Sequence, residues 1–398
     1  MRKSALLTIL LPSVALAEAW RPSDFEISSW NMAVSATNTC DSTFSPVGLA
    51  ISMAMLGEAT TGEHRAQIAQ SMGIMSDFAS TFAFILESYA GTSASNAVSI
   101  SFAPSIWSRR IKAMNIEYRH SMSKIFGAVS DRISTPLPIN AWTEAATDGK
   151  FPELVTDADM DSDLLMLNAI GFEGAWKDEF DRSRTSDVNF RMDDGRTAKV
   201  KCMHCESTVT RIRSTEFSAI RLPFAADGMS MIYILPPAGM DIGRFRAQIG
   251  DKISIDEIKS RFRAGIGIDV ETLPLKLSIP RMEMRSRWNL NDFISHFNIP
   301  TTGYSRLGET LRLDRVIQAA YIKIDERGYS LTPGRKPPPK QKKFDRGWRH
   351  DDPEENEADS RPKAVNESFL LNRPFVYMVW DANTDTIILA GQFAGTSR

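Results

Sequence analysis

The chain is poor in cysteine and histidine, and each shortage argues against a class of protein. Its 398 residues contain three cysteines, Cys40, Cys202 and Cys205, and five histidines. Three thiols cannot all pair within one chain, so stability has to come from a hydrophobic core rather than from a disulfide framework. The histidines are not spaced as metal ligands, and we expect neither a metal nor another cofactor.

Two of the cysteines, Cys202 and Cys205, form a C-x-x-C motif. A redox-active motif of this kind belongs at a strand-to-helix junction, whereas this one follows a β-rich segment, 197–201. We interpret the pair either as a local disulfide or as two structural thiols.

Strong net charge and long apolar segments are also missing. The formal net charge is −2, which gives no argument for binding nucleic acid or a membrane. Beyond the N-terminus no apolar run is long enough for a membrane helix. The hydrophobic content of 42% is sufficient for a sizeable core, in one large domain or two ordinary ones.

The first 17 residues have the three parts of a secretory signal. Arg2 and Lys3 form a short positive region, 5–16 is apolar, and Ala15-Leu16-Ala17 is a small-x-small cleavage site. The alternative is a buried N-terminal helix. We predict a signal peptide at 1–17 and a secreted, extracellular, monomeric product in which 18–398 form a single domain.

Helical patterns dominate the first part of the chain and strand patterns the second. Apolar spacing and end signals predict helices over 20–38, 45–57, 61–73, 77–90, 115–126 and 139–147. Strands are predicted over 97–107, 164–172, 187–191, 196–203, 217–223, 229–235, 273–280, 316–324, 375–381 and 386–393. This order indicates an α+β fold without internal repeats.

Several short motifs occur in a fixed order along the chain. They are Phe44-Ser45-Pro46 before a Met-rich helix, Thr61-Gly62-Glu63, Ile139-Asn140-Ala141-Trp142, the 167–177 segment LNAIGFEGAWK, the 277–281 segment LSIPR, and Asn372-Arg373-Pro374-Phe375. Together they resemble the serpin family of serine protease inhibitors over nearly the whole mature chain. The resemblance implies no enzymatic activity. It implies the serpin fold: N-terminal helices, a large central mixed sheet, a β-rich C-terminal region and an exposed reactive-centre loop, here 325–368.

The hinge of this loop departs from the family pattern. In an inhibitory serpin a protease cuts the loop, whose N-terminal part then inserts as a new strand of the main sheet. Glu326 and Gly328 match the family's turn, but Tyr329 stands where Thr or Ser is usual, and Leu331 and Pro333 where small residues are usual. Proline removes a ladder donor and fixes φ. We therefore expect a hinge that inserts slowly or not at all, in a loop longer than is typical.

A second group of residues belongs to the region that opens during insertion. It comprises Ser45, Gly48, Asn168 and Gln318. Gly48 stands where the family commonly has Ser, and Gln318 where many members have His. We expect both changes to weaken the polar network, although Gln can still donate and accept hydrogen bonds. The Asn168 side chain, in a buried run, is available to bond neighbouring elements.

The loop itself carries segregated charge, basic over 335–349 and acidic over 351–359. One interpretation is a solvated segment, and the other is a bait for proteases. Lys342, Lys343 and Arg346 form the candidate scissile region, because trypsin-like proteases cut after Lys or Arg. Asn366 begins an N-E-S glycosylation sequon. Helix 77–90, which carries heparin sites in some serpins, has almost no basic residues, so we expect no heparin site there.

These observations leave three functions open. The favoured one is a secreted serpin-fold protein that traps proteases weakly or not at all, acting by binding or as a protease substrate. The alternative is an inhibitor of an extracellular trypsin-like serine protease by the suicide-substrate mechanism. A carrier with a pocket in the fold rests on analogy alone.

Overall fold

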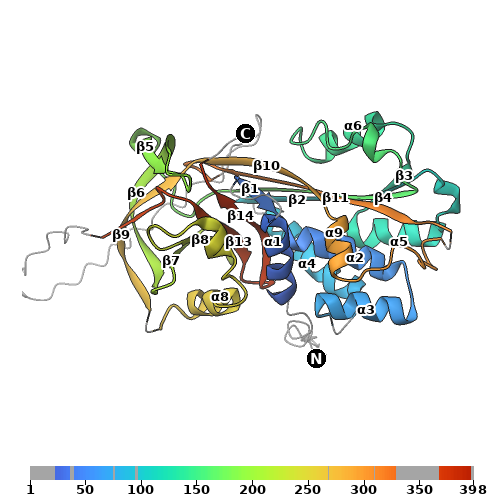
Figure 1. The fold of residues 1–398 in the computed structure, drawn as a ribbon, viewed down its shortest axis with the longest axis horizontal. Helices are drawn as coiled ribbons and strands as arrows, with labels where there is room; N and C mark the ends of the chain where they lie inside the picture. Colours follow the sequence, from blue (N-terminus) through green and yellow to red (C-terminus); the bar gives the residue numbers. More distant parts are fainter. Residues whose placement is uncertain are drawn as a thin grey trace, which may run out of the picture.

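The computed structural model describes residues 23–35, 40–74, 77–94, 97–267, 269–308, 310–328 and 367–395. Within these residues the chain folds into two β-sheets with helices packed around them (Figure 1). Part of the predicted helix 20–38, the signal peptide 1–17 and most of the loop lie outside the described residues.

The smaller sheet has five strands in the order β10-β11-β4-β2-β3. Their bounds are Met282–Asn289 (β10), Leu313–Ile324 (β11), Leu164–Gly174 (β4), Val98–Ser108 (β2) and Val129–Arg132 (β3). Strands β11 and β4 are parallel neighbours, paired from Leu313 with Leu164 to Ile322 with Phe172. The sheet is therefore closed at its centre, with nothing between these two strands.

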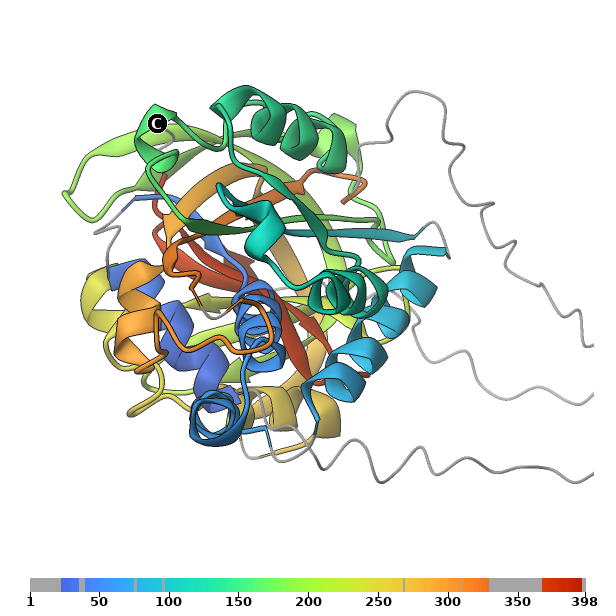
Figure 2. The same ribbon diagram turned by 90° about the vertical axis from the view of Figure 1, so that its right-hand side faces the viewer.

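The larger sheet has nine strands, in the order β1-β14-β13-β8-β7-β6-β9-β12, with β5 paired to β6. The bounds are Ser42–Phe44 (β1), Ser186–Arg191 (β5), Thr197–Arg213 (β6), Ser218–Pro223 (β7), Met229–Leu235 (β8), Val270–Pro280 (β9), Ser368–Leu370 (β12), Phe375–Asp381 (β13) and Thr386–Phe393 (β14). In Figure 2 the red strands β13 and β14 run through the middle of the molecule. They form the antiparallel hairpin that the polar 382–385 turn predicts.

The helices cluster in the N-terminal half. Their bounds are Ser23–Ser35 (α1), Pro46–Glu58 (α2), Gly62–Met72 (α3), Phe78–Ala94 (α4), Ile116–Phe126 (α5), Pro136–Ala146 (α6), Ile242–Arg246 (α7), Ile255–Ala264 (α8) and Asn291–His296 (α9). Helix α2 begins as its sequence predicts: Ser45 accepts a hydrogen bond from the Gly48 amide and Pro46 occupies the first turn. Every residue of 46–57 is buried, so α2 is a core helix.

Strands β4 and β11 are buried on both faces. Val316, Ala320 and Ile322 of β11 belong to the main core, as do alternate residues of β4. The residues between them, such as Ile317 and Ala319, belong to a second cluster that includes Ile139 of α6. Figure 1 shows α6 on one side of this sheet and α2, α4 and α5 on the other. The continuous apolar run at 164–172 is the sequence mark of such a strand.

The predicted α+β fold is confirmed, and most of the predicted helices and strands are present within a few residues of their bounds in the described parts. The strand predicted over 196–203 is much longer and extends to Arg213 as β6. Strands β1, β3 and β10 and helices α7, α8 and α9 were not predicted. All three cysteines are free thiols, so the local disulfide is absent and the structural interpretation of the pair holds. Cys202 is buried on β6, and burial raises the pKa of Cys205 to about 11. None of the described helices is both long enough and apolar enough to span a bilayer.

Candidate functional site

The candidate site begins where β11 ends, at the buried carboxylate of Glu326. Arg281 donates to this carboxylate through Nε at 2.7 Å, and also through Nη2. The Thr185 hydroxyl donates a further hydrogen bond, and Arg182 lies 3.8 Å away. Burial alone would raise the pKa of Glu326, but the hydrogen bonds from Thr185 and Arg281 hold it below its ordinary value. The end of β11 is thereby fixed to the start of β10 and to the segment before β5.

The turn after Glu326 is fastened to the segment that follows β4. Backbone amides of Gly174, Trp176 and Phe180 donate to the carbonyls of Gly328, Arg327 and Glu326 at 3.2, 2.9 and 2.8 Å. The Trp176 indole donates to the carbonyl of Asp325 at 2.9 Å.

Gly328 has to be glycine here for two reasons. Its φ is +75°, which side-chain-bearing residues rarely adopt, and a Cβ would collide with the carbonyl oxygen of Gly174. Gly328 is the last described residue of the hinge, and its conformation is fixed by these contacts.

The opening region forms one hydrogen-bond network beneath the sheet. The Gln318 amide accepts from the Ser45 backbone amide at 2.8 Å and donates to the Ser45 carbonyl at 2.9 Å. Asn168 donates to the Gly48 carbonyl at 2.6 Å. Strands β4 and β11 are each held to the start of α2 in this way. We expected Gln318 to weaken this polar network. Both its amide oxygen and its amide nitrogen are nevertheless hydrogen-bonded, so no bond is missing at this position.

Gly48 allows the close approach of α2 to the sheet. A Cβ there would lie 2.5 Å from Cδ1 of Ile170 and 3.1 Å from Nε2 of Gln318. A serine at this position would require the buried Ile170 side chain to shift. The residue types at positions 48 and 318 are therefore linked, because a serine Cβ at position 48 would lie within 4 Å of the Gln318 amide.

The other predicted site residues lie outside the described residues. These are Tyr329, Leu331 and Pro333 of the hinge, Lys342, Lys343 and Arg346 of the candidate scissile region, and Asn366 of the sequon. The structure therefore brings together Glu326 and Gly328 at one end of β4 and β11, and Ser45, Gly48, Asn168 and Gln318 further along the same two strands.

Two functional contacts were not predicted from the sequence. Arg281 is the last residue of the LSIPR motif, but nothing in the sequence pairs it with Glu326. Arg211, almost fully buried, donates to Glu271 at 2.6 Å and to Glu367 at 2.7 Å. Glu367 is the first residue described again near the distal end of the loop, so Arg211 holds that end beside β9.

Comparison with known proteins decides the family. The sequence model described as "Serpin (serine protease inhibitor)" matches residues 22–395. The chain belongs to the serpin family. Serpins in general inhibit serine proteases and are not enzymes themselves.

Relatives of this serpin include proteins that are named as inhibitors and ovalbumin, which is not. Ovalbumin from Coturnix coturnix is 24% identical over 320 residues, which are 76% of this chain and 75% of that protein. Leukocyte elastase inhibitor from Sus scrofa is 24% identical over 201 residues, 48% of this chain and 52% of that protein. Relatedness to this serpin therefore does not by itself decide between inhibition and its absence.

Solved structures agree on the fold. Native protease nexin-1 with heparin matches with a TM-score of 0.77 at 19% identity, covering 96% of this serpin and 99% of that chain. The thermophilic serpin tengpin in its native state matches with a TM-score of 0.75 at 17% identity, covering 94% and 93%. At these identities the likeness shows the serpin fold alone.

Proposed function

We propose that this serpin is a secreted protein that traps proteases weakly or not at all, and that it acts by binding or as a protease substrate. The observation that carries the proposal is the burial of both faces of β4 and β11, taken with the residues that follow Gly328. A strand that enters between β4 and β11 has to place its side chains alternately into two packed layers.

The first residues of such a strand fit those layers poorly. Residues two apart along a strand share a face, so Tyr329, Leu331 and Pro333 would all enter the same layer. Both layers are already filled, one by the main core and one by the cluster beneath α6. Inserting bulk into a packed layer forces off-rotamer side chains and backbone shifts. Pro333 also lacks the amide that a central strand has to donate.

The existing contacts raise the barrier further. Insertion has to separate β11 from β4 over their whole paired length and to release the turn at 325–328 from Gly174 and Trp176. A slow insertion gives the cleaving protease time to hydrolyse the acyl intermediate and leave. Cleavage of the basic loop segment would then yield a cut serpin and an active protease.

The experiment is exposure of residues 18–398 to trypsin, followed by a denaturing gel and thermal melting of intact and cleaved protein. We expect cleavage within 335–349, no complex on the gel and no rise in melting temperature. A triple variant, Tyr329→Thr with Leu331→Ala and Pro333→Ala, should shift the outcome toward a covalent complex. A gel-stable complex formed by the unaltered protein would refute the proposal, and an unimproved triple variant would refute the hinge as its cause.

Inhibition of an extracellular trypsin-like serine protease is the second candidate. It is favoured by the closed arrangement of β4 and β11, which leaves the position of a new central strand unfilled, and by the basic segment with Lys342, Lys343 and Arg346. The same gel separates the two candidates.

Further proposals concern partners, modification and localisation. The sequence 1–17 supports secretion, and Asn366 supports glycosylation in the secretory route. Helix α4 contains neither Lys nor Arg, which supports the absence of a heparin site on that helix. We propose a monomer without affinity for nucleic acid or membranes, in keeping with a net charge of −2.

A further inference from the structure

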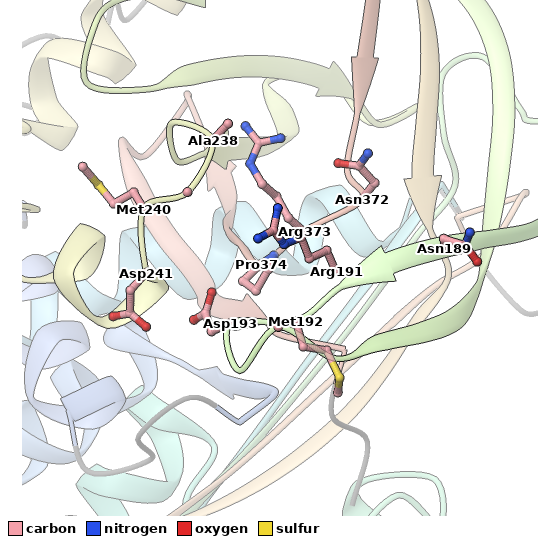
Figure 3. Close-up of a pocket in the computed structure, with 12 residues that line it drawn as sticks. Asn189, Arg191, Met192, Asp193, Ala238, Met240, Asp241, Asn372, Arg373 and Pro374 are labelled. Atoms are coloured by element: carbon pink, nitrogen blue, oxygen red, sulfur yellow. The ribbon is translucent and has the colours of Figure 1, made fainter.

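A pocket of about 340 Å³ lies between parts of the chain that have no role in the hinge. It is lined by the end of β5 and the turn after it, by the loop before α7, and by 372–374, the segment between β12 and β13 (Figure 3). Its volume is at the lower end of the range typical of small-ligand sites. It is distinct from the closed sheet, and an inference about it does not depend on whether the loop inserts.

Two arginines in this pocket lack an acidic partner. The Arg191 guanidinium makes no hydrogen bond or ion pair with any described residue, and Arg191 is exposed to solvent at the pocket. Arg373 donates from Nη2 to the Pro236 carbonyl at 2.7 Å, while its buried Nε has no partner among the described residues. Both arginines line the pocket, and their side chains are labelled in Figure 3.

An unpaired charge is costly to bury, and Arg373 is partly buried. Desolvation accordingly lowers the pKa of Arg373. The amides of Asn189 and Asn372 also line the pocket and make no side-chain hydrogen bond with the described residues. The pocket therefore gathers unused donors around two cationic groups, which is the arrangement that an oxyanion would satisfy.

The opposite side of the pocket is acidic. Asp193 accepts a hydrogen bond from the Ile242 amide at 3.0 Å, and Asp241 accepts one from the Arg244 amide at 3.0 Å. In Figure 3 Asp241 lies toward α7, and Asp193 lies between Asp241 and the arginines. Burial, with the neighbouring charge of Asp241, raises the pKa of Asp193. Each carboxylate thus accepts a hydrogen bond from a backbone amide at the start of α7, and neither forms an ion pair with Arg191 or Arg373.

We propose that this pocket binds a small organic phosphate or sulfate. Its oxyanion lies between Arg191 and Arg373, and its ammonium or hydroxyl group faces Asp193 and Asp241. A guanidinium binds such an oxyanion through two parallel hydrogen bonds, which fixes orientation as well as charge. The pocket holds more than the ion alone, so the ligand has a short polar body beyond its oxyanion.

The test is calorimetric titration of the full mature chain at low ionic strength with three probes: inorganic phosphate, inorganic sulfate and O-phosphoethanolamine. We expect O-phosphoethanolamine to bind more tightly than inorganic phosphate, because its ammonium reaches the acidic side. Comparison of phosphate with sulfate shows which oxyanion the arginines prefer. Arg191→Gln should weaken all three probes by about tenfold or more, since it removes a charge-assisted contact.

Two further variants complete the test: one probes the acidic side of the pocket, and the other is a control outside it. Asp193→Asn keeps an acceptor for the Ile242 amide, and it should abolish the advantage of O-phosphoethanolamine without weakening inorganic phosphate. Arg196→Gln is the matched control, because Arg196 lies on the same hairpin but pairs with Asp194 at 2.6 Å and does not line the pocket. It should bind all three probes as the unaltered protein does.

Each contrary outcome overturns the proposal. The first is an absence of binding by every probe at concentrations up to about 1 mM. The second is unchanged binding in Arg191→Gln. The third is an equal loss in Arg191→Gln and Arg196→Gln, which would indicate general charge attraction rather than a site. Arg191 is exposed, so its replacement should leave the melting temperature unchanged, and that measurement excludes misfolding as the cause.

Discussion

Arg281 and Glu326 form an ion pair at the end of the closed sheet, with Nε of Arg281 2.7 Å from the Glu326 carboxylate. Arg281 lies immediately before β10, and Glu326 two residues after β11, so the pair joins the ends of two neighbouring antiparallel strands. The same carboxylate begins the turn that leads into the loop. Any movement of the loop into the sheet starts from this fixed point.

Replacing Arg281 with glutamine should destabilise the protein by about 1–3 kcal/mol, because it leaves the buried Glu326 carboxylate with a weaker partner. Chemical denaturation measures the change. Arg285→Gln is the control, since Arg285 pairs with Glu283 on the surface of the same strand, where such pairs contribute about 0–1 kcal/mol. Equal losses of stability in the two variants would show that the Arg281–Glu326 pair stabilises the protein no more than the surface pair does.

Glu26 should make stability fall as the pH rises. This α1 carboxylate is fully buried, and burial raises its pKa from 4.5 to about 8 although Lys259 lies 4.0 Å away. The folded state therefore holds a proton that the unfolded state releases above pH 4.5. Stability from this group is complete below pH 4.5 and declines up to pH 8, by at most about 1.4 kcal/mol per pH unit.

The measurement is unfolding at pH 5.5, 6.5 and 7.5 (about one unit apart, within the titration window of a group shifted by burial). Glu26→Gln keeps an acceptor for the Ile387 amide, which now bonds Oε1 at 2.7 Å, and should flatten the profile. A variant with the same slope as the unaltered protein would place the titrating group elsewhere.

Adding a methyl group at Gly48 should destabilise the protein by about 1–3 kcal/mol, because its Cβ would meet Ile170 at 2.5 Å. The matched control is Gly91→Ala in helix α4, where a Cβ meets nothing within 4 Å. That change should be neutral or stabilise by about 0.5–1 kcal/mol, since alanine is the better helix former. Thermal melting of the two variants should therefore move in opposite directions.

Asn366 should carry a glycan when the full chain is expressed in a secreting eukaryotic host. Its neighbour Glu367 is exposed and pairs with Arg211 just before β12, which supports modification of this sequon. Enzymatic deglycosylation should reduce the mass of the secreted protein. Asn366→Gln should abolish that shift, and a shift that persists in this variant would mean that another site is modified.

Much of the fold was predictable because its strongest sequence signals are local. Ser45-Pro46 indicates where α2 begins, and the apolar run at 164–172, interrupted only by Asn168, indicates that β4 is buried on both faces. Helix α8 was missed although Ser254 caps it, because its ten residues are half charged and only one narrow face is buried. Strand β10 was missed although its buried positions alternate with Arg and Glu, which is the pattern of a strand with one exposed face.

The sequence by itself determined the family motifs, the glycine that the hinge turn requires, and the bulky residues Tyr329, Leu331 and Pro333 that follow it. These are matters of residue type at a given place in the chain. Only the tertiary structure decided that Arg281 neutralises Glu326, that Gln318 bonds Ser45, and that Arg191 and Arg373 share a pocket. Their members stand 45, 273 and 182 positions apart in the chain. Contacts of that kind arise from how strands are ordered in the sheets, and no local pattern of residues encodes that order.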